Sequence, residues 1–305
     1  MTGFTSLPAT AACPVWPFLL RSAGLVLECQ TVYAIHRDRT APVTLLSLLS
    51  LAGYSLSAFL IYRNLSNWRP SQRWIALSPA LFAVLIEALQ LRQAIYLPDG
   101  RLDLDFFNAF ALISWLVSIQ IMIASLHRPL HSLGIPMFPV AGLAALAAAV
   151  MPTGHGYVLT PSAAIQGHIM LSIIAYSLIM LSALHAVVLA WQDHAIRSHH
   201  PGGLVRFLPP LHDMETLLFQ MLGFGFIFLT SSLITGFLFF EDLFAQHLAH
   251  KTLLSLIGWV ILAVLLFGRF RFGWRGKKAI RLTLSAFVFI MLAYFGSKLV
   301  LEFLV

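Results

Sequence analysis

The chain has 305 residues, of which 59% are hydrophobic and only 10% are charged, and its formal net charge is +7. A soluble domain cannot bury so large an apolar fraction, so this composition predicts an integral membrane protein. The positive charge lies in short connections between apolar runs, which sets membrane orientation and excludes a nucleic-acid-binding face. Cys13 and Cys29 form no C-x-x-C pair, which excludes a thiol oxidoreductase or a cysteine metal site.

Residues 1–42 fit a membrane span poorly. Their apolar run is interrupted by Arg21 and Glu28 and is followed by Arg37 and Arg39. Three interpretations are open: an additional span, an uncleaved signal-like segment, or residues upstream of the true start. Isolated charges at mid-membrane depth are costly, which disfavours the additional span. We therefore leave residues 1–42 unassigned.

Residues 43–305 are predicted to form one polytopic membrane domain. A helix needs about 20 apolar residues to cross the hydrocarbon core of a bilayer. Eight stretches meet this requirement, at 43–62, 74–92, 106–126, 135–152, 164–191, 215–239, 250–268 and 280–304. We therefore expect an all-α integral membrane protein, a bundle of about eight transmembrane helices. The short connections leave no room for a soluble catalytic domain, so we do not expect an enzyme.

The connections between these spans alternate in charge. Lys and Arg gather in 63–73, at Arg128, in 197–206 and above all in 269–281, whereas 153–163 contains neither residue and 240–249 is acidic. Because basic connections stay in the cytoplasm, both termini should lie outside.

Three histidines are expected at the outer level. His168 lies near the outer end of the fifth span, His247 lies in the connection before the seventh, and His250 lies where the seventh begins. Spaced three residues apart, the latter two would share one face of a helix. Two imidazoles at one depth on separate helices make a plausible axial pair for haem iron. A headgroup-solvated histidine, or one packed into a helix interface, fits the same pattern.

Glu87 lies within the second span, about 8 Å inside its outer end at the rise of an α-helix. A carboxylate at this depth usually faces the bundle interior, so Glu87 and Gln90 are predicted to line a polar cavity. A neutral Glu87 bonded to a neighbouring helix is the alternative. A transporter with Glu87 in an ion path would be expected to have paired broken helices, which the sequence does not show.

Several motifs resemble the integral-membrane cytochrome c assembly proteins of the CcsA/CcmC type, and most closely their YpjD and HemX-like branch. Segment 167–176 resembles the family's histidine-led span, 273–279 and 294–296 resemble its last loop and span, and 240–252 resembles the YpjD branch. Weaker similarity extends back to about residue 43, through 100–108 and 114–115. The resemblance implies a bacterial inner-membrane protein.

Members of this family hold haem at the outer face between histidines that flank a tryptophan-rich segment, and pass it to apocytochrome c. His168 matches the first of these histidines. Residues 241–252 stand in place of the tryptophan-rich segment. Lys251 and Trp259 are the main residues that still resemble it. The second flanking histidine has no counterpart after the last span, so His250 or His247 would have to substitute.

We therefore expect a haem-binding protein of the cytochrome c biogenesis type. The axial ligands would be His168 and His250, with His247 as an alternate, and Lys251 would meet the haem propionates. The expected partners are the lipid bilayer and apocytochrome c or other cytochrome assembly proteins. The alternative is a haem-free membrane scaffold or regulator that acts through the basic connections 197–206 and 269–281.

Overall fold

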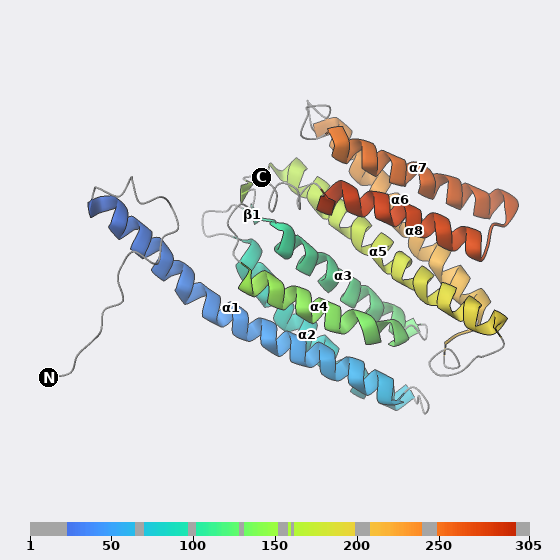
Figure 1. The fold of residues 1–305 in the computed structure, drawn as a ribbon, viewed down its shortest axis with the longest axis horizontal. Coiled ribbons are helices and arrows are strands. Elements are labelled where there is room, and N and C mark those ends of the chain that lie inside the picture. Colours follow the sequence, from blue (N-terminus) through green and yellow to red (C-terminus); the bar gives the residue numbers. More distant parts are fainter. Residues whose placement is uncertain are drawn as a thin grey trace.

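The computed structural model describes residues 23–64, 70–96, 102–127, 131–151, 158–159, 162–198, 208–239 and 249–296. Within these residues, eight helices are long and apolar enough to cross a membrane, which confirms the predicted fold class (Figure 1). The spanning stretches begin and end within a few residues of the predicted limits for the first seven. For the eighth, the described part ends at Gly296, whereas the prediction ran to 304.

The elements follow one another as a series of helices joined by short connections. The helices are α1 (Ala23–Asn64), α2 (Pro70–Ile95), α3 (Phe106–His127), α4 (Gly134–Val150), α5 (Ala163–Arg197), α6 (Leu211–Phe239), α7 (Ala249–Phe272) and α8 (Lys277–Met291). A short 3₁₀ turn, His131–Leu133, precedes α4, and a π-helical turn, Leu292–Gly296, continues α8.

The connections that enter α3 and α5 meet in a small antiparallel sheet that the hydropathy pattern does not indicate. Its strands are β1 (Leu102–Asp103) and β2 (Val158–Leu159), paired with Leu102 opposite Leu159. Directly after β1, the side chain of Asp105 accepts a hydrogen bond from the backbone N–H of Asn108 at 2.7 Å, which satisfies a free donor at the start of α3.

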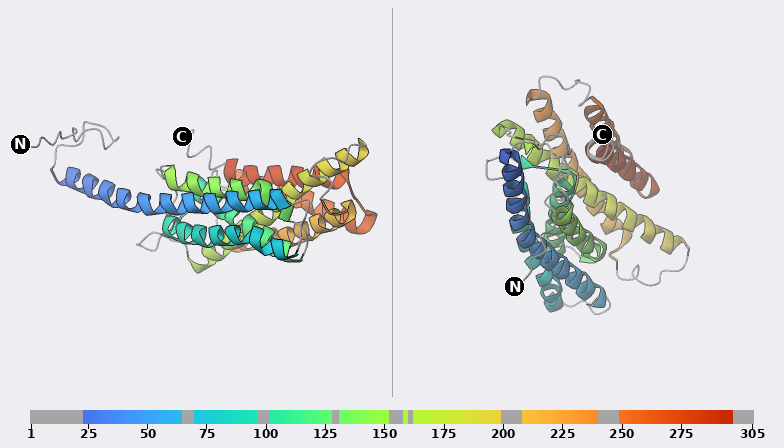
Figure 2. Two further views of the ribbon diagram at one scale, coloured as in Figure 1. Left: turned by 90° about the horizontal axis from the view of Figure 1, so that it is seen from below. Right: turned by 60° about the vertical axis from the view of Figure 1, so that its left-hand side comes forward.

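Helix α1 begins well before the first spanning stretch. It runs from Ala23, whereas the stretch that is apolar enough to cross the membrane starts at Val43. The projecting part of α1 stands clear of the bundle in Figure 2. Residues 23–42 are thus helical and continuous with the first span, while 1–22 lie outside the described residues.

The bundle consists of two groups of helices that share a central contact. Helix α1 packs against α2 and α4, and α3 packs against α2 and α4. In the other group α5 packs against α6 and α8, and α7 packs against α6 and α8. The contact between α3 and α5 joins the two groups, as Figures 1 and 2 show.

Small residues let the helices approach closely, as is usual in membrane bundles. A Cβ atom on Gly53 would lie 2.9 Å from the Pro79 carbonyl oxygen, so only glycine fits where α1 meets α2. A Cβ atom on Gly258 would lie 2.4 Å from Cγ1 of Ile290 at the contact between α7 and α8. These two contacts hold one helix pair in each half of the bundle.

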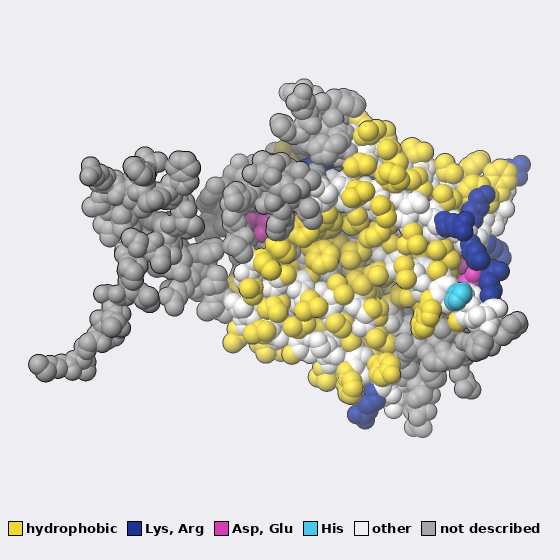
Figure 3. All heavy atoms as spheres, in the orientation of Figure 1, with side chains coloured by type: hydrophobic (Ala, Val, Ile, Leu, Met, Phe, Trp, Pro, Cys, Tyr) yellow, Lys and Arg dark blue, Asp and Glu magenta, His cyan; other side chains and the backbone are white. Residues whose placement is uncertain are grey.

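The face of the bundle drawn in Figure 3 is largely apolar, with Lys and Arg gathered mainly at one end. We call this end, where α5 and α7 finish and α8 begins, the basic end; its cations include Arg197, Arg269, Arg271, Arg275, Lys277, Lys278 and Arg281. The positive-inside rule makes the basic end the expected cytoplasmic end. Because α5, α6 and α7 alternate in direction, α5 and α7 both begin at the opposite end (Figure 1).

Candidate functional site

His168 lies on the first turns of α5, at the end opposite the basic end. Ser162 caps this helix: its side chain accepts a hydrogen bond from the backbone N–H of Ile165 at 3.5 Å, and its carbonyl accepts one from Gln166 at 3.0 Å. A serine at this position favours the start of a helix. The cap fixes the direction in which α5 leaves the connection, and the imidazole of His168 is half-buried against α6.

Hydrogen bonds to α6 fix which nitrogen of His168 carries the proton. Nδ1 lies 3.0 Å from the Ser232 carbonyl oxygen and 3.1 Å from Oγ1 of Thr235. A carbonyl oxygen can only accept, so Nδ1 must donate. The Thr235 hydroxyl gives its own proton to a backbone carbonyl of α6 at 2.9–3.0 Å, which leaves its oxygen able to accept as well. A neutral His168 therefore has its lone pair on Nε2, the form that ligates metals.

Gly236 lets the His168 ring lie directly on the surface of α6. A Cβ atom at this position would come within 3.1 Å of Cε1 of His168. On the other side of the histidine, a Cβ atom on Gly167 would meet nothing within 4 Å among the described residues, and Gly167 is exposed. The small residue that accommodates the ring is thus Gly236, and space adjoins Gly167.

A second rung of hydrogen bonds ties α5 to α6 one turn further along. Ser172 donates to the His168 carbonyl oxygen at 2.8 Å, and its hydroxyl oxygen lies 2.6 Å from that of Ser232. Because Ser172 donates its only hydroxyl proton to the His168 carbonyl oxygen, Ser232 is the donor in the bond between the two serine hydroxyls. Ser232 therefore makes two contacts with α5: its carbonyl oxygen accepts a hydrogen bond from His168, and its hydroxyl donates one to Ser172.

The seventh helix brings the other predicted ligands to the same end of the bundle. Helix α7 begins at Ala249, so the backbone of His250 and the half-buried Lys251 lie in its first turn. The side chain of His250 and the whole of His247 lie outside the described residues. Within the part that the structure describes, no group of three His, Cys, Asp or Glu residues could hold a metal ion.

Trp259, two turns beyond Lys251, holds α7 against α6. Its indole N–H donates to Oγ1 of Thr230 at 2.9 Å, and its ring stacks on Phe226 with centroids 5.5 Å apart. Thr230 and Thr235 belong to the same helix as Ser232. Helix α6 is therefore the common support of α5 with His168 and of α7 with Lys251.

Glu87 occupies a different part of the bundle. The Tyr54 hydroxyl donates to its Oε2 at 2.6 Å, and the Tyr54 ring stacks on Phe138 with centroids 5.7 Å apart. The carboxyl group is fully buried, and its Oε1 has no hydrogen-bond partner among the described residues. Gln90 donates to the Ala145 carbonyl oxygen at 2.7 Å. Glu87 thus joins α1 to α2 rather than adjoining His168, and the polar cavity stays a prediction.

The sequence pattern identified His168 but not the residues that orient it. Ser232, Thr235 and Gly236 are spaced so that they share one face of α6, and Ser172 lies one turn after His168. A stripe of hydroxyl and small residues within an otherwise apolar span is the signal that could have identified them, because such stripes line contacts between membrane helices. Gly167, the small residue directly before His168, does not pack against another helix in the described part.

Comparison with known proteins agrees with this architecture. Residues 74–305 match the family described as cytochrome C assembly protein. The inner membrane protein YpjD of Escherichia coli K12 is 31% identical over 258 residues, which cover 83% of this chain and 97% of YpjD. An uncharacterized 28.8 kDa protein of Azospirillum brasilense is 36% identical over 47% of this chain and 54% of its own length.

A more distant relative is the cytochrome c biogenesis protein CcsA of Chlamydomonas reinhardtii, 22% identical over 44% of this chain and 38% of its own length. No solved structure is significantly similar to this chain. The family match extends from the first turns of α2 to the end of the chain, and YpjD aligns over almost its whole length. This multi-pass membrane protein therefore belongs to the cytochrome c assembly protein family.

Proposed function

We propose that this protein binds haem at the end of the bundle where α5 and α7 begin, with His168 as an axial ligand. Membership of the cytochrome c assembly family supports a role in cytochrome c biogenesis. The observation that carries the haem proposal is the hydrogen bond from Nδ1 of His168 to the Ser232 carbonyl oxygen. Metal-ligating histidines usually donate their second ring nitrogen in this way, which orients the ring and makes the ligating nitrogen more basic.

The surroundings of His168 suit a large, flat and mostly apolar ligand. Gly236 seats the imidazole on α6, and no described atom lies within 4 Å of a Cβ placed on Gly167, the residue before His168. Thr235 provides a second acceptor for Nδ1, so one N–H of the ring is shared between two acceptors on α6. Haem, when bound, supplies an iron that accepts axial imidazoles and changes oxidation state. The protein supplies position and electrostatics, and we propose no catalytic turnover.

A second axial ligand would come from α7 or the connection before it. His250 lies in the first turn of α7, which begins at the same end as α5, and His247 precedes it by three residues. Lys251 would pair with a haem propionate, because a charge-assisted bond to a carboxylate is among the stronger polar contacts. This end should face outward from the bacterial inner membrane, where apocytochrome c or another assembly protein would meet it.

Visible spectroscopy tests the proposal directly. The protein is purified in mild detergent, supplied with haem, and its oxidised and dithionite-reduced spectra are compared with those of His168→Ala and His250→Ala. The proposal expects a bis-histidine spectrum in the wild type and a loss of most bound haem in each variant. His212→Ala, an exposed histidine on α6 at the basic end, is the matched control and should keep the wild-type spectrum.

Two further outcomes would change the conclusion. Unchanged haem content in the His168→Ala/His250→Ala double variant would contradict both ligand assignments. A rescue experiment is the control: recovery of the spectrum when free imidazole is added to His168→Gly would show that this variant has lost a ligand and is not misfolded. A wild-type protein that stays colourless with added haem would contradict haem binding altogether.

The exposed cations of the basic end favour a second candidate, a haem-free scaffold or regulator that holds a cytoplasmic protein. Arg197, Arg271, Arg275 and Lys277 are all exposed there. Capture of a defined cytoplasmic protein from the same bacterium, lost when Arg271 and Arg275 are replaced by Gln, would support this candidate. It would be rejected if the same proteins were captured by wild type and variant alike.

A further inference from the structure

A pocket of about 210 Å³ lies at the basic end, between the last turns of α5 and the first turns of α8. Its α5 side contains Asp193, His194 and Arg197, and its α8 side contains Lys277 and Arg281. Ala190 and Ile280 add apolar surface. This pocket is at the other end of α5 from His168, so it is separate from the proposed haem site.

The spacing of the lining residues explains why the pocket forms. Positions 190, 193, 194 and 197 share one face of α5, and positions 277, 280 and 281 share one face of α8. Helices α5 and α8 pack against each other, so the two faces meet. On α5 the charged side chains lie nearer the end of the helix than Ala190, whereas on α8 Ile280 lies between Lys277 and Arg281. The pocket therefore combines apolar and cationic lining residues.

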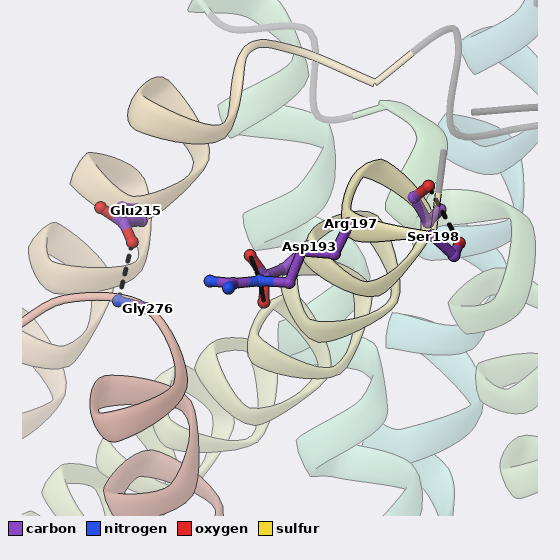
Figure 4. A network of polar contacts seen from close by, with 6 residues as sticks. Asp193, Arg197, Ser198, Glu215 and Gly276 are labelled. Atoms are coloured by element: carbon purple, nitrogen blue, oxygen red, sulfur yellow. Dashed lines mark hydrogen bonds and ion pairs between the residues drawn. The ribbon is translucent and has the colours of Figure 1, made fainter. Parts of the chain in front are cut away.

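Arg197 is held in place by Asp193. Its Nε lies 2.9 Å from both carboxylate oxygens of Asp193, and the Asp193 side chain is 11% exposed against 63% for Arg197. The carboxylate thus anchors the inner part of the guanidinium. Figure 4 shows the two terminal nitrogens extending away from α5. Arg197 can therefore present these donors to a ligand without losing its bond to Asp193.

The start of α8 is fixed by an acid that does not neutralise the pocket. Oε1 of the buried Glu215 accepts a hydrogen bond from the backbone N–H of Gly276 at 2.8 Å (Figure 4). Lys277 and Arg281 follow, one helical turn apart and both exposed. Among the described residues, no carboxylate lies within ion-pair distance of either cation. Three cations against one carboxylate leave the pocket with net positive charge, and the N-terminal turn of α8 adds to it.

We propose that this pocket binds a phosphate group. A tetrahedral anion matches the donors of two arginines and a lysine, which form charge-assisted hydrogen bonds to phosphate oxygens. Two sources share this chemistry: the headgroup of an anionic phospholipid and a free phosphate. The apolar lining residues favour the phospholipid, since Ala190 and Ile280 would adjoin its acyl chains. Trp191, the next residue along α5 after Ala190, is 45% exposed and suits the level of lipid headgroups.

The test measures binding of phosphatidylglycerol by delipidated protein. Native mass spectrometry would compare retention of phosphatidylglycerol and phosphatidylcholine by wild type, by Lys277→Gln/Arg281→Gln, and by Arg271→Gln/Arg275→Gln. The last variant removes the same charge from the basic end but leaves the pocket intact. Near a membrane surface each cation contributes about 1 kcal/mol, so the pocket variant should bind phosphatidylglycerol about tenfold to thirtyfold more weakly. The control should bind within about threefold of wild type, because Arg271 and Arg275 are exposed outside the pocket and exposed charges contribute roughly 0–1 kcal/mol to an ion pair.

A second arm identifies the source. Isothermal titration of the lipid-free protein with inorganic phosphate should show no more than weak binding if the headgroup is the ligand. Tight binding of phosphate that is lost in Lys277→Gln/Arg281→Gln would instead assign a free phosphate. Ala190→Phe, which fills the pocket without changing its charge, should lower binding in either case.

Three results would overturn the proposal. They are equal retention of phosphatidylglycerol by wild type and the pocket variant, equal losses in the pocket variant and the control, and capture of an acidic cytoplasmic protein at Lys277 and Arg281 without any phosphate binding. The last would assign these cations to a protein partner. A melting temperature close to that of the wild type shows that each variant has folded.

Discussion

Gly236 determines how closely the His168 ring can lie on α6, because a Cβ there would be 3.1 Å from Cε1 of the ring. Gly236→Ala should push the ring away from the Ser232 carbonyl and weaken haem binding about tenfold, the lower end of the effect of disturbing an outer-shell partner. Haem titration followed by absorbance measures this. Gly223→Ala on the same helix is the control, since a Cβ there meets nothing within 4 Å. Equal affinities in the two variants would contradict a role for the ring position.

The buried pair of Tyr54 and Glu87 makes a separate prediction about stability. Tyr54→Phe removes the donor to Oε2 of a fully buried carboxyl group and should lower the free energy of unfolding by about 1–3 kcal/mol. Glu87→Gln keeps a carbonyl oxygen that can accept from Tyr54, so its cost should be smaller. Unfolding in mixed detergent micelles compares the variants. A larger loss in Glu87→Gln than in Tyr54→Phe would contradict the donor assignment.

At the scale of single residues, the sequence indicates which polar side chains are unusual but not what they bond. A histidine and a glutamate inside apolar runs are conspicuous because polar groups are costly in hydrocarbon. The partners of His168 are a backbone carbonyl and a threonine on α6, at positions 232 and 235, more than sixty residues away. The carbonyl could come from any residue type, and only the Thr235 hydroxyl depends on its side chain. The pairing therefore depends on how α5 and α6 pack, which hydropathy does not encode.

The limits of the helices follow from hydropathy more closely than any other feature. The spans predicted at 106–126 and 215–239 correspond to helices Phe106–His127 and Leu211–Phe239, because the bilayer demands a minimum apolar length. The pairing of β1 with β2 could not be predicted, since each strand has two residues and its partner lies in a distant connection. The helical conformation of 23–42 was also missed, because its interrupting charges obscure a helix that continues past the membrane.

The contact between α7 and α8 gives a prediction at the scale of elements. Gly258→Ala would place a Cβ 2.4 Å from Cγ1 of Ile290, so the Ile290 side chain or one of the helices has to shift. Overpacking of this kind usually costs about 1–3 kcal/mol. Gly223→Ala should be neutral or slightly stabilising, since alanine favours helix more than glycine does. Thermal unfolding in detergent compares the two variants. Equal melting temperatures would show that the contact between α7 and α8 accommodates the added Cβ without a loss of stability.

For the whole molecule, the charge distribution predicts the orientation in the membrane. In a protein with Cys13 and Cys29 replaced by Ser, a single cysteine at Arg275→Cys should be protected from a membrane-impermeant thiol reagent in intact spheroplasts. A cysteine at Tyr96→Cys, exposed at the opposite end, should be labelled almost completely. Permeabilised cells provide the control for accessibility. The reverse pattern would place the basic end outside and contradict the orientation inferred from the positive-inside rule.

The length of α5 has a mechanical consequence. Its 35 residues span about 52 Å, whereas the hydrocarbon core of a bilayer is about 30 Å thick. The helix must therefore lean or protrude, and a thinner bilayer makes it lean further. His168 and Arg197 are separated along this one rod by about 44 Å. A change of tilt thus displaces the imidazole and the guanidinium in opposite lateral directions at once, so that bilayer thickness acts on both ends of the protein through a single helix.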